Sequence, residues 1–344
     1  MSVSEGTGDA RYIEEAVRNA IEGAVWAPSV HNTQPWWFGT AEVDGGVRVT
    51  LYADPERRLA VADPEGREMV VSCGAALATL RLGILAAGYV PEVDIVPDSE
   101  KPDLLAEVTV RERAEPPPEA VRLFAQARDR RTHRGAFAEK GPPEYLMSSL
   151  IEEARLEDAD LRVMSDPRKT RALGALSDAA EQFQRLDDRY QAELARWSPG
   201  SGSGRRDGVP DTAYPIESQE THPNFPERSF RHGRAQGMDV GAEVPGETGT
   251  VCVIETATDD RVAWLAAGQA LQRVLLHAAA DHYAAALHTQ ALEVPAFREL
   301  ISGHLCEGHH PQMVFRLGRS GPIFTSIRRE TSAVVFRDPR PAHP

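Results

Sequence analysis

The chain has 344 residues, of which 41% are hydrophobic and 26% charged, and this ordinary globular composition excludes a wholly disordered or fibrous protein. Lysine and arginine total 38 against 52 aspartate and glutamate residues, so the formal net charge is −14. Such an acidic surface repels nucleic acid and anionic membranes, and we expect neither as a partner, although net charge leaves room for a local basic pocket that binds one small anion.

The N-terminal residues lack the basic and apolar segments of a signal peptide, which predicts a cytoplasmic protein. The three cysteines, Cys73, Cys252 and Cys306, cannot all pair within one chain and are not spaced as zinc ligands. Buried, reduced thiols are therefore expected. The apolar run at residues 70–90 contains many small residues and a charged one, which favours a buried helix over a membrane span.

Residues 1–118 show the pattern of one α+β unit. Apolar residues at 13, 17, 21 and 25 share one face of a predicted helix over 11–26. Asp44-Gly45-Gly46 marks a hairpin turn between two strands. A long helix near 68–88 and strands near 92–96 and 104–112 follow. The cluster Pro116-Pro117-Pro118 then predicts the boundary between a first unit, 1–118, and a second unit, 119–344.

The second unit repeats this mixture of helices and strands. Its pattern predicts helices over about 119–128, 143–155, 167–197, 260–282 and 295–303, and strands near 160–164, 249–257 and 312–319. Residues 198–250 differ, because they are rich in Gly, Ser and Pro and show little periodicity. Such a long irregular stretch is typical of a lid, a binding loop or a disordered insert.

Two apolar helices indicate an internal repeat. SCGAALATLRLGILAAGY (72–89) aligns with AAGQALQRVLLHAAADHY (266–283) at a constant offset of 194, which places Gly74 on Gly268 and Tyr89 on Tyr283. Each helix leads into a strand that carries an arginine. The pattern predicts two copies of one α+β unit, the second enlarged by the insert. The alternative is a chance match between Ala/Leu-rich helices.

A polar loop, Ala27–Trp36, directly follows the first helix. Its two prolines stiffen the backbone, and five hydrogen-bonding side chains lie between them. Asparagine and glutamine each offer a donor and an acceptor, which suits the edge of a planar heterocycle. On composition alone, the alternative of a helix-capping loop without a ligand is favoured.

Two arginine motifs could hold an anion. Arg130-Arg131-Thr132-His133-Arg134 places three guanidinium groups and a hydroxyl within five residues, and guanidinium groups match phosphate oxygens. Arg328-Arg329 is a weaker signal of the same kind. The alternative for both is a solvated basic loop in an acidic protein.

The loop APSxHNTQPW after a first helix, followed by RRTxR with Phe137 three residues on, resembles the nitroreductase-like FMN-binding superfamily. The similarity is greatest to its internally duplicated Acg-type branch, through SCGAAL, GQALQRVLLHA, QALEVPAFREL and RLGRSGP followed by SIRR. The resemblance covers about residues 11–330. It implies an α+β, nitroreductase-like fold of two fused pseudo-symmetric halves, an intramolecular pseudo-dimer with a lid insertion at about 198–250 in the second half.

The resemblance also implies one FMN site between the halves, because the polar loop occurs only in the first half and the arginine motif only in the second. A monomer is then feasible. Carried over residue by residue, the expected FMN-binding residues are Pro28, Ser29, Val30, Asn32 and Gln34 from the loop, Arg130, Thr132 and Arg134 at the phosphate and pyrimidine side, Thr289 and Gln290 near the N5/O4 edge, and Arg328 and Arg329 at the phosphate.

Two functions follow from the resemblance. The first is an FMN-dependent oxidoreductase of nitroreductase type, in which NAD(P)H drives two-electron reduction of a small organic substrate, or the reverse dehydrogenation. The second is a lid-covered FMN storage, sequestration or stress protein with little turnover. A degenerate fold without flavin is disfavoured by the retained motifs. No metal site is expected, no residue is assigned a catalytic role, and an acid–base role for His31 is not favoured.

Overall fold

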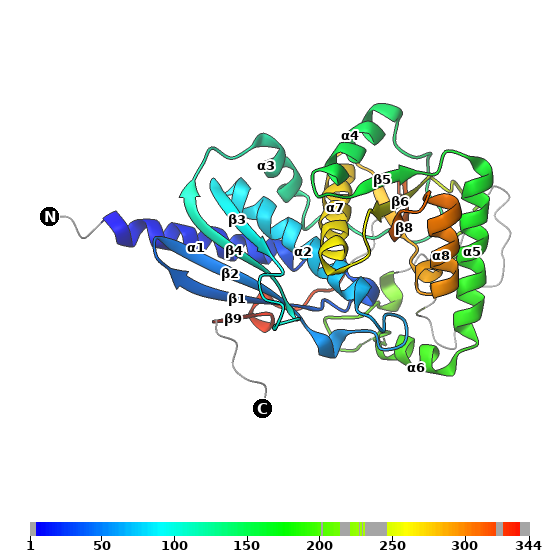
Figure 1. Ribbon diagram of the computed structural model, residues 1–344, viewed down its shortest axis with the longest axis horizontal. Helices are drawn as coiled ribbons and strands as arrows, with labels where there is room; N and C mark the ends of the chain where they lie inside the picture. The colour runs from blue at the N-terminus through cyan, green and yellow to red at the C-terminus, as the bar shows by residue number, and fades with distance from the viewer. Residues whose placement is uncertain are drawn as a thin grey trace.

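The computed structural model describes residues 5–200, 202–213, 221–226, 228, 230, 246–320 and 326–337. Two α+β units lie side by side, and two long helices, α2 (Arg67–Ala86) and α7 (Arg261–Ala280), pack against each other between them (Figure 1). One continuous apolar core runs through both units, with side chains from Ile13 to Val334. The α+β prediction is therefore confirmed.

The first unit is a mixed sheet, antiparallel except for its edge strand β9 (Val335–Arg337), with helices packed on one face. The hairpin β1 (Trp36–Val43) and β2 (Gly46–Ala53) forms as predicted, and α1 (Glu5–Ala24) and α2 pack over the sheet. Alternate β2 residues Val47, Val49 and Leu51 are buried in the core, as expected for a strand with one solvated face. The sheet order is β3-β4-β2-β1-β9, with β3 (Tyr89–Ile95) and β4 (Leu104–Arg113).

The C-terminal strand belongs to the second unit by sequence but lies in the sheet of the first unit. β9 pairs in parallel with β1, so a segment of 119–344 completes the sheet of the first unit (Figure 1). The short helix α3 (Pro118–Ala125) begins within the proline cluster and packs on α2 and α7. The pairing of β9 with β1 holds the segment before β9, which carries Arg328 and Arg329, against the first unit.

The second unit has a sheet covered on both faces. In β6 (Thr250–Thr256), Cys252 and Ile254 face the central core, whereas Val251 and Val253 face a separate cluster with α5 and α8. The sheet order is β5-β6-β8-β7, with β5 (Asp160–Val163), β7 (Ala284–Leu287) and β8 (His310–Gly318), and the remaining helices are α4 (Glu144–Arg155), α5 (Pro167–Arg185), α6 (Asp188–Arg196) and α8 (Pro295–Leu305).

One predicted helix differs in the structure, and two strands occur that the sequence did not predict. The single helix predicted over 167–197 is wrong, because it is two helices: the side chain of Asp187 accepts hydrogen bonds from the backbone N–H groups of Arg189 and Tyr190 and so begins α6. The strands β7 and β9 were not predicted. β7 has the sequence AAAL, which lacks the β-branched and aromatic residues that mark a strand.

The crossing of α2 and α7 brings the two aligned glycines together. A Cβ on Gly74 would lie 2.2 Å from the carbonyl oxygen of Leu265, and one on Gly268 would lie 2.0 Å from that of Val71. Leu265 is separated from Val71 by 194 residues, as Gly268 is from Gly74, so the two contacts are reciprocal under the offset of the repeat. Such reciprocity is what a two-fold axis between related halves produces, and it supports the predicted duplication.

Among the described residues, α2 is the one helix long and apolar enough to cross a membrane. In the structure, 83% of its apolar window is buried inside the molecule. It is thus a core helix, as the sequence predicts, and its apolar residues contact α1, α7 and the first sheet.

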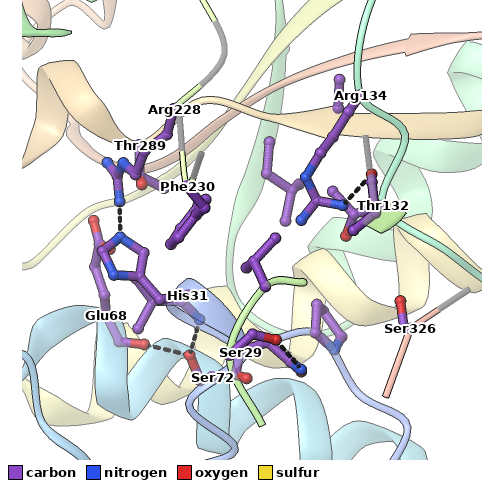
Figure 2. Close-up of a pocket in the computed structure, with 18 of the residues that line it drawn as sticks. Ser29, His31, Glu68, Ser72, Thr132, Arg134, Arg228, Phe230, Thr289 and Ser326 are labelled. Atoms are coloured by element: carbon purple, nitrogen blue, oxygen red, sulfur yellow. Dashed lines mark hydrogen bonds between the residues drawn. The ribbon is translucent and has the colours of Figure 1, made fainter. Parts of the chain in front are cut away.

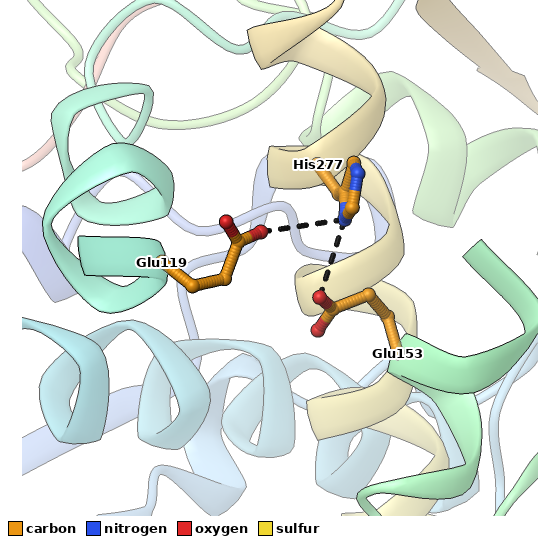
Figure 3. Close-up of side chains that lie close together, drawn as sticks. All are labelled: Glu119, Glu153 and His277. Carbon is orange, nitrogen blue, oxygen red and sulfur yellow. Dashed lines mark hydrogen bonds and ion pairs between the residues drawn. The ribbon is translucent and has the colours of Figure 1, made fainter. Parts of the chain in front are cut away.

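A polar cluster joins three helices away from the apolar core. His277 Nδ1 on α7 lies 3.2 Å from Glu153 of α4 and 3.5 Å from Glu119 of α3 (Figure 3). Each carboxylate also has an arginine, with Arg273 2.7 Å from Glu153 and Arg122 2.7 Å from Glu119. These three side chains lie close enough together to hold a metal ion. The arginines already neutralise the charge of the carboxylates, so we interpret the cluster as a set of ion pairs that links the three helices.

Candidate functional site

A cavity lies where the two units meet, and both contribute to its wall (Figure 2). The first unit supplies residues 28–32 of the polar loop and the N-terminal part of α2, and the second supplies residues 132–134 and 286–290. Residues 326–328 close it on the side of the C-terminal segment. The cavity volume is about 140 Å³, below the roughly 300–1,000 Å³ of most small-molecule sites. The described part of the 198–250 insert fills some of this space through Gly208, Val209, Pro210, Ala213, Arg228 and Phe230.

The polar loop holds a strained backbone. His31, Asn32 and Gln34 have φ values of 46°, 53° and 51°, a left-handed region that costs energy for residues other than glycine. Two hydrogen bonds stabilise this shape: Gln34 N–H donates to Ser29 Oγ at 2.9 Å, and Val30 N–H donates to Ser72 Oγ of α2 at 3.2 Å. These hydrogen bonds therefore hold the shape of the loop and fix it against α2.

Asn32 connects three segments at the cavity wall. Its Nδ2 donates to the carbonyl oxygens of Gly208 at 2.8 Å and Ile327 at 3.1 Å. Its Oδ1 accepts a hydrogen bond from Arg328 at 2.9 Å. The loop, the insert and the C-terminal segment are thus held together by one side chain.

Replacing Asn32 by alanine is expected to lower the free energy of unfolding by about 2–4 kcal/mol, because three hydrogen bonds are lost and partly buried partners are left without one. Urea denaturation followed by circular dichroism measures this. Ser148→Ala on the exposed face of α4 is the control and should change little. An Asn32→Ala protein within 0.5 kcal/mol of the parent would show that Asn32 does not join these segments.

Gln34 and Arg329 pair with each other outside the cavity. Gln34 Oε1 accepts from the backbone N–H of Arg329 at 2.7 Å, and its Nε2 donates to the carbonyl oxygen of Arg206 at 2.9 Å. The Arg329 guanidinium donates to the carbonyl oxygens of Gln34 and Ala333 and lies over the ring of Trp37. Both side chains fasten the C-terminal segment to the loop.

An arginine cluster lies on the other side of the loop. Arg328 is 5% exposed, and its guanidinium donates to Asn32 and to the carbonyl oxygens of Ile327, Trp26 and Ala27. Arg130 is 4% exposed and donates to Trp26 O at 3.2 Å. Within the described part of the chain, the Nε atoms of both arginines are buried without a partner. The partners that the cluster does have are neutral oxygens.

The pKa values of these side chains reflect the crowding of positive charge. Burial lowers the pKa of Arg130 to about 9, with a further contribution from Arg131. Burial, together with Arg130, Arg131 and Arg134, holds the pKa of Arg328 well below its usual range. A bound anion would oppose both effects, because it supplies the missing negative charge and accepts the unused N–H donors.

The structure brings nine of the twelve predicted site residues to one cavity: Pro28, Ser29, Val30, Asn32, Thr132, Arg134, Thr289, Gln290 and Arg328. The other three, Gln34, Arg130 and Arg329, lie outside its lining. Thr289 and Gln290 direct hydrogen bonds elsewhere, since Thr289 Oγ1 donates to Glu293 at 2.8 Å and Gln290 Nε2 donates to the carbonyl oxygen of Pro226 at 3.1 Å. Their assignment to FMN stays a prediction, as does that of the whole set.

Several cavity residues were not predicted. Glu68 of α2, His288 after β7, and Arg228 and Phe230 of the insert all line the wall. Arg228 forms a buried ion pair of 2.5 Å with Glu293. The sequence offered no signal for Arg228, because the insert shows no periodicity and its partner lies 65 residues away. The rest of the predicted lid, including 214–220 and 231–245, lies outside the described residues.

Comparison with known proteins shows the family of the chain. The chain is 33% identical over 328 residues to "Putative NAD(P)H nitroreductase Rv3131" of Mycobacterium tuberculosis, covering 93% of this chain and 91% of the relative. It is 28% identical over 312 residues to "Putative NAD(P)H nitroreductase acg" of the same species, covering 90% and 91%. This chain belongs to the nitroreductase-like family, in its Acg-type branch. No family model matches the sequence.

Solved structures of nitroreductases are more distant from this nitroreductase-like chain. A nitroreductase with bound FMN from Desulfitobacterium hafniense is 13% identical, with a TM-score of 0.41, and the alignment covers 63% of this chain and 98% of that one. A structure described as a nitroreductase from Anabaena variabilis is 12% identical, with a TM-score of 0.40, covering 89% and 73%.

The cavity residues fit the two chemically different ends of FMN. The buried N–H donors of Arg328, with Arg134 beside the cavity, suit a phosphate dianion. The loop adds amide and hydroxyl groups of the kind that reads a flavin edge. The small cavity volume means that the insert residues at the wall must shift before an isoalloxazine ring fits between these groups.

Proposed function

We propose that the protein is an FMN-dependent oxidoreductase that takes electrons from NAD(P)H and reduces a small organic acceptor, or runs the reverse dehydrogenation, at one FMN site between the two units. The observation that carries the proposal is the convergence of the polar loop from the first unit with Arg134 and Arg328 from the second on a single cavity. The names of the relatives, NAD(P)H nitroreductases, support the electron donor.

In this proposal, Arg328 and Arg134 hold the phosphate, and Arg130 adds positive potential from behind the cavity wall. Ser29, Val30 and Asn32 of the loop, with Thr132 opposite, hold the ring. Bound FMN would supply the hydride-transfer chemistry. The chain's own part is to bind, orient and shield the cofactor. The two units of one chain would form the whole site, so a monomer suffices.

A second candidate is a flavin-binding protein with little turnover. It is favoured by the small cavity and by the buried ion pair of Arg228, which fastens a segment of the insert over the polar loop. If that segment stays in place, NAD(P)H and the acceptor cannot reach the flavin together.

Anaerobic titration of the FMN-loaded protein distinguishes the two candidates. Rapid bleaching of the flavin absorbance by NADPH or NADH, followed by reoxidation with nitrofurazone or a quinone, is expected for the oxidoreductase. A flavin that resists both nicotinamides but is reduced by dithionite would overturn that proposal in favour of the storage role. Protein that binds no FMN would contradict both.

A further inference from the structure

Three of the described histidines line the cavity, His31, His133 and His288, and in His31 and His288 a buried arginine lies at the Nε2 atom. Arg228 Nη1 contacts His31 Nε2, and Arg316 Nε donates to His288 Nε2 at 2.8 Å. A guanidinium group has only N–H donors, so Nε2 must be the acceptor in both rings. In a neutral imidazole the one remaining proton then lies on Nδ1. The two arginines therefore select the same tautomer in both histidines.

The two rings differ at Nδ1. His288 Nδ1 lies 3.3 Å from the carbonyl oxygen of Pro226, which accepts a hydrogen bond from the Nδ1–H group. His31 Nδ1 is buried, and no partner for it exists in the part of the chain that the structure describes. A buried N–H without an acceptor costs roughly 1–3 kcal/mol. His31 is 7% exposed and lines the cavity, so the acceptor that it lacks is expected on a bound molecule.

Arg228 is itself fixed in place. Its Nη2 forms the 2.5 Å ion pair with Glu293, and its guanidinium lies over the ring of Tyr190, 5.8 Å from the centroid. Figure 2 shows the Arg228 guanidinium meeting one nitrogen of the His31 ring, with Glu68 beside them. Phe230 packs edge-on to the same ring, with 5.0 Å between centroids. The ring of His31 can therefore neither rotate nor exchange its acceptor for a donor at low cost.

The charges around His31 keep its ring neutral. Burial and the neighbouring Arg228 hold the pKa of His31 well below its usual range. Glu68, the nearby carboxyl group on α2, does not offset this, because burial and Glu293 raise its own pKa well above the usual range. His31 thus has one proton to share and no tendency to take up a second.

We propose that His31 is a ligand-binding donor that presents its Nδ1–H to a carbonyl, nitro or ring-nitrogen acceptor of the molecule in the cavity, and that Arg228 is the positioning residue that commits the proton to Nδ1. The proposal rests on the proposed function in that oxidised FMN and its electron acceptors both carry such atoms. No proton is transferred: a donor fixed beside an oxygen that gains negative charge on reduction stabilises the reduced form. The insert thereby contributes to recognition as well as cover.

A matched pair of variants separates the two roles of the ring. His31→Asn keeps an N–H near the Nδ1 position, loses the acceptor for Arg228, and tolerates a φ of 46°. His31→Gln keeps an acceptor near the Nε2 position and loses the Nδ1 donor. If the donor serves FMN, the Kd of FMN should rise about 3- to 10-fold in His31→Gln and much less in His31→Asn. If the donor serves the second substrate, the same pattern should appear in the KM of duroquinone at unchanged FMN affinity.

Nitrogen-15 NMR of protein labelled at histidine tests the proposal without turnover. The parent protein should show a protonated Nδ1 and an unprotonated Nε2 for His31 and His288. Adding FMN, duroquinone or nitrobenzene should move the His31 Nδ1–H resonance, whereas that of His288 should stay in place as an internal control. In Arg228→Met the Nδ1–H signal should give way to a mixture of tautomers.

An Nε2-protonated or doubly protonated His31 would overturn the proposal. The proposal would also fail if FMN binds, as seen by absorbance, and none of the three ligands shifts the His31 Nδ1–H resonance. The proposed function would then stand without the donor role of His31. The opposite result separates the donor role from the flavin assignment. If no FMN binds but duroquinone or nitrobenzene shifts His31 Nδ1–H, the donor role stands and the flavin assignment fails.

Discussion

Alanine at Gly74 or Gly268 is expected to destabilise the protein by about 3–5 kcal/mol, the largest stability effect predicted for a single methyl group here. The added Cβ would lie 2.2 Å from the carbonyl oxygen of Leu265 or 2.0 Å from that of Val71. Both are backbone atoms within helices, so no side-chain rotation relieves the overlap. The helices α2 and α7 would have to separate, and this would open the core that both units share.

Urea denaturation measures this effect, with Gly303→Ala as the control. Gly303 is exposed on α8, and a Cβ there meets nothing within 4 Å. Alanine at that position should be neutral or stabilise the protein by up to about 1 kcal/mol, because it favours the helix. If Gly74→Ala and Gly268→Ala cost no more than Gly303→Ala, the close crossing of α2 and α7 is wrong.

Arg134→Ala is expected to weaken FMN binding about 10- to 100-fold, because a charge-assisted hydrogen bond contributes roughly 1.5–3 kcal/mol. Arg134 lines the cavity from the second unit, next to Thr132 and across from the polar loop. Its removal takes away positive charge at the position proposed for the phosphate. Fluorescence titration of FMN against apoprotein gives the affinity directly.

The matched control for Arg134→Ala is Arg128→Ala. Arg128 is exposed, precedes the same loop and pairs only with Glu22 at 3.2 Å among its described contacts. The substitution Arg128→Ala removes the same charge from the protein at a position outside the cavity lining. The affinity for FMN should therefore stay within about 2-fold of that of the parent protein. Equal affinity in Arg134→Ala, Arg128→Ala and the parent would count against the whole site assignment.

Much of the fold could be predicted from periodicity. The helices that became α1, α2 and α7 show apolar residues at helical spacing, and the hairpin of β1 and β2 carries its turn in Asp44-Gly45-Gly46. The aligned glycines Gly74 and Gly268 lie against each other in the structure, a contact that the alignment itself did not predict. The predictions that failed depend on local capping or on distant partners. The helix α5 ends at Arg185 and Asp187 begins α6. The strand β7 forms because β8 lies beside it.

Site residues that belong to a sequence motif could be predicted, but the direction in which each side chain points could not. Gln34 belongs to the same loop as Asn32, yet the left-handed backbone turns its side chain to Arg206 and Arg329 instead of the cavity. Arg329 is adjacent to Arg328 and likewise points away. Glu68, His288 and Arg228 reach the cavity through tertiary packing, and no local spacing marks them.

The central claim is that the first unit's polar loop and the second unit's arginines hold one flavin between them. A crystal structure of the protein with FMN tests this most directly. We predict one FMN per chain, with its phosphate on Arg328 and Arg134 and its ring against residues 29–32. An FMN bound elsewhere, or bound in this cavity with its phosphate remote from both arginines, would contradict the claim.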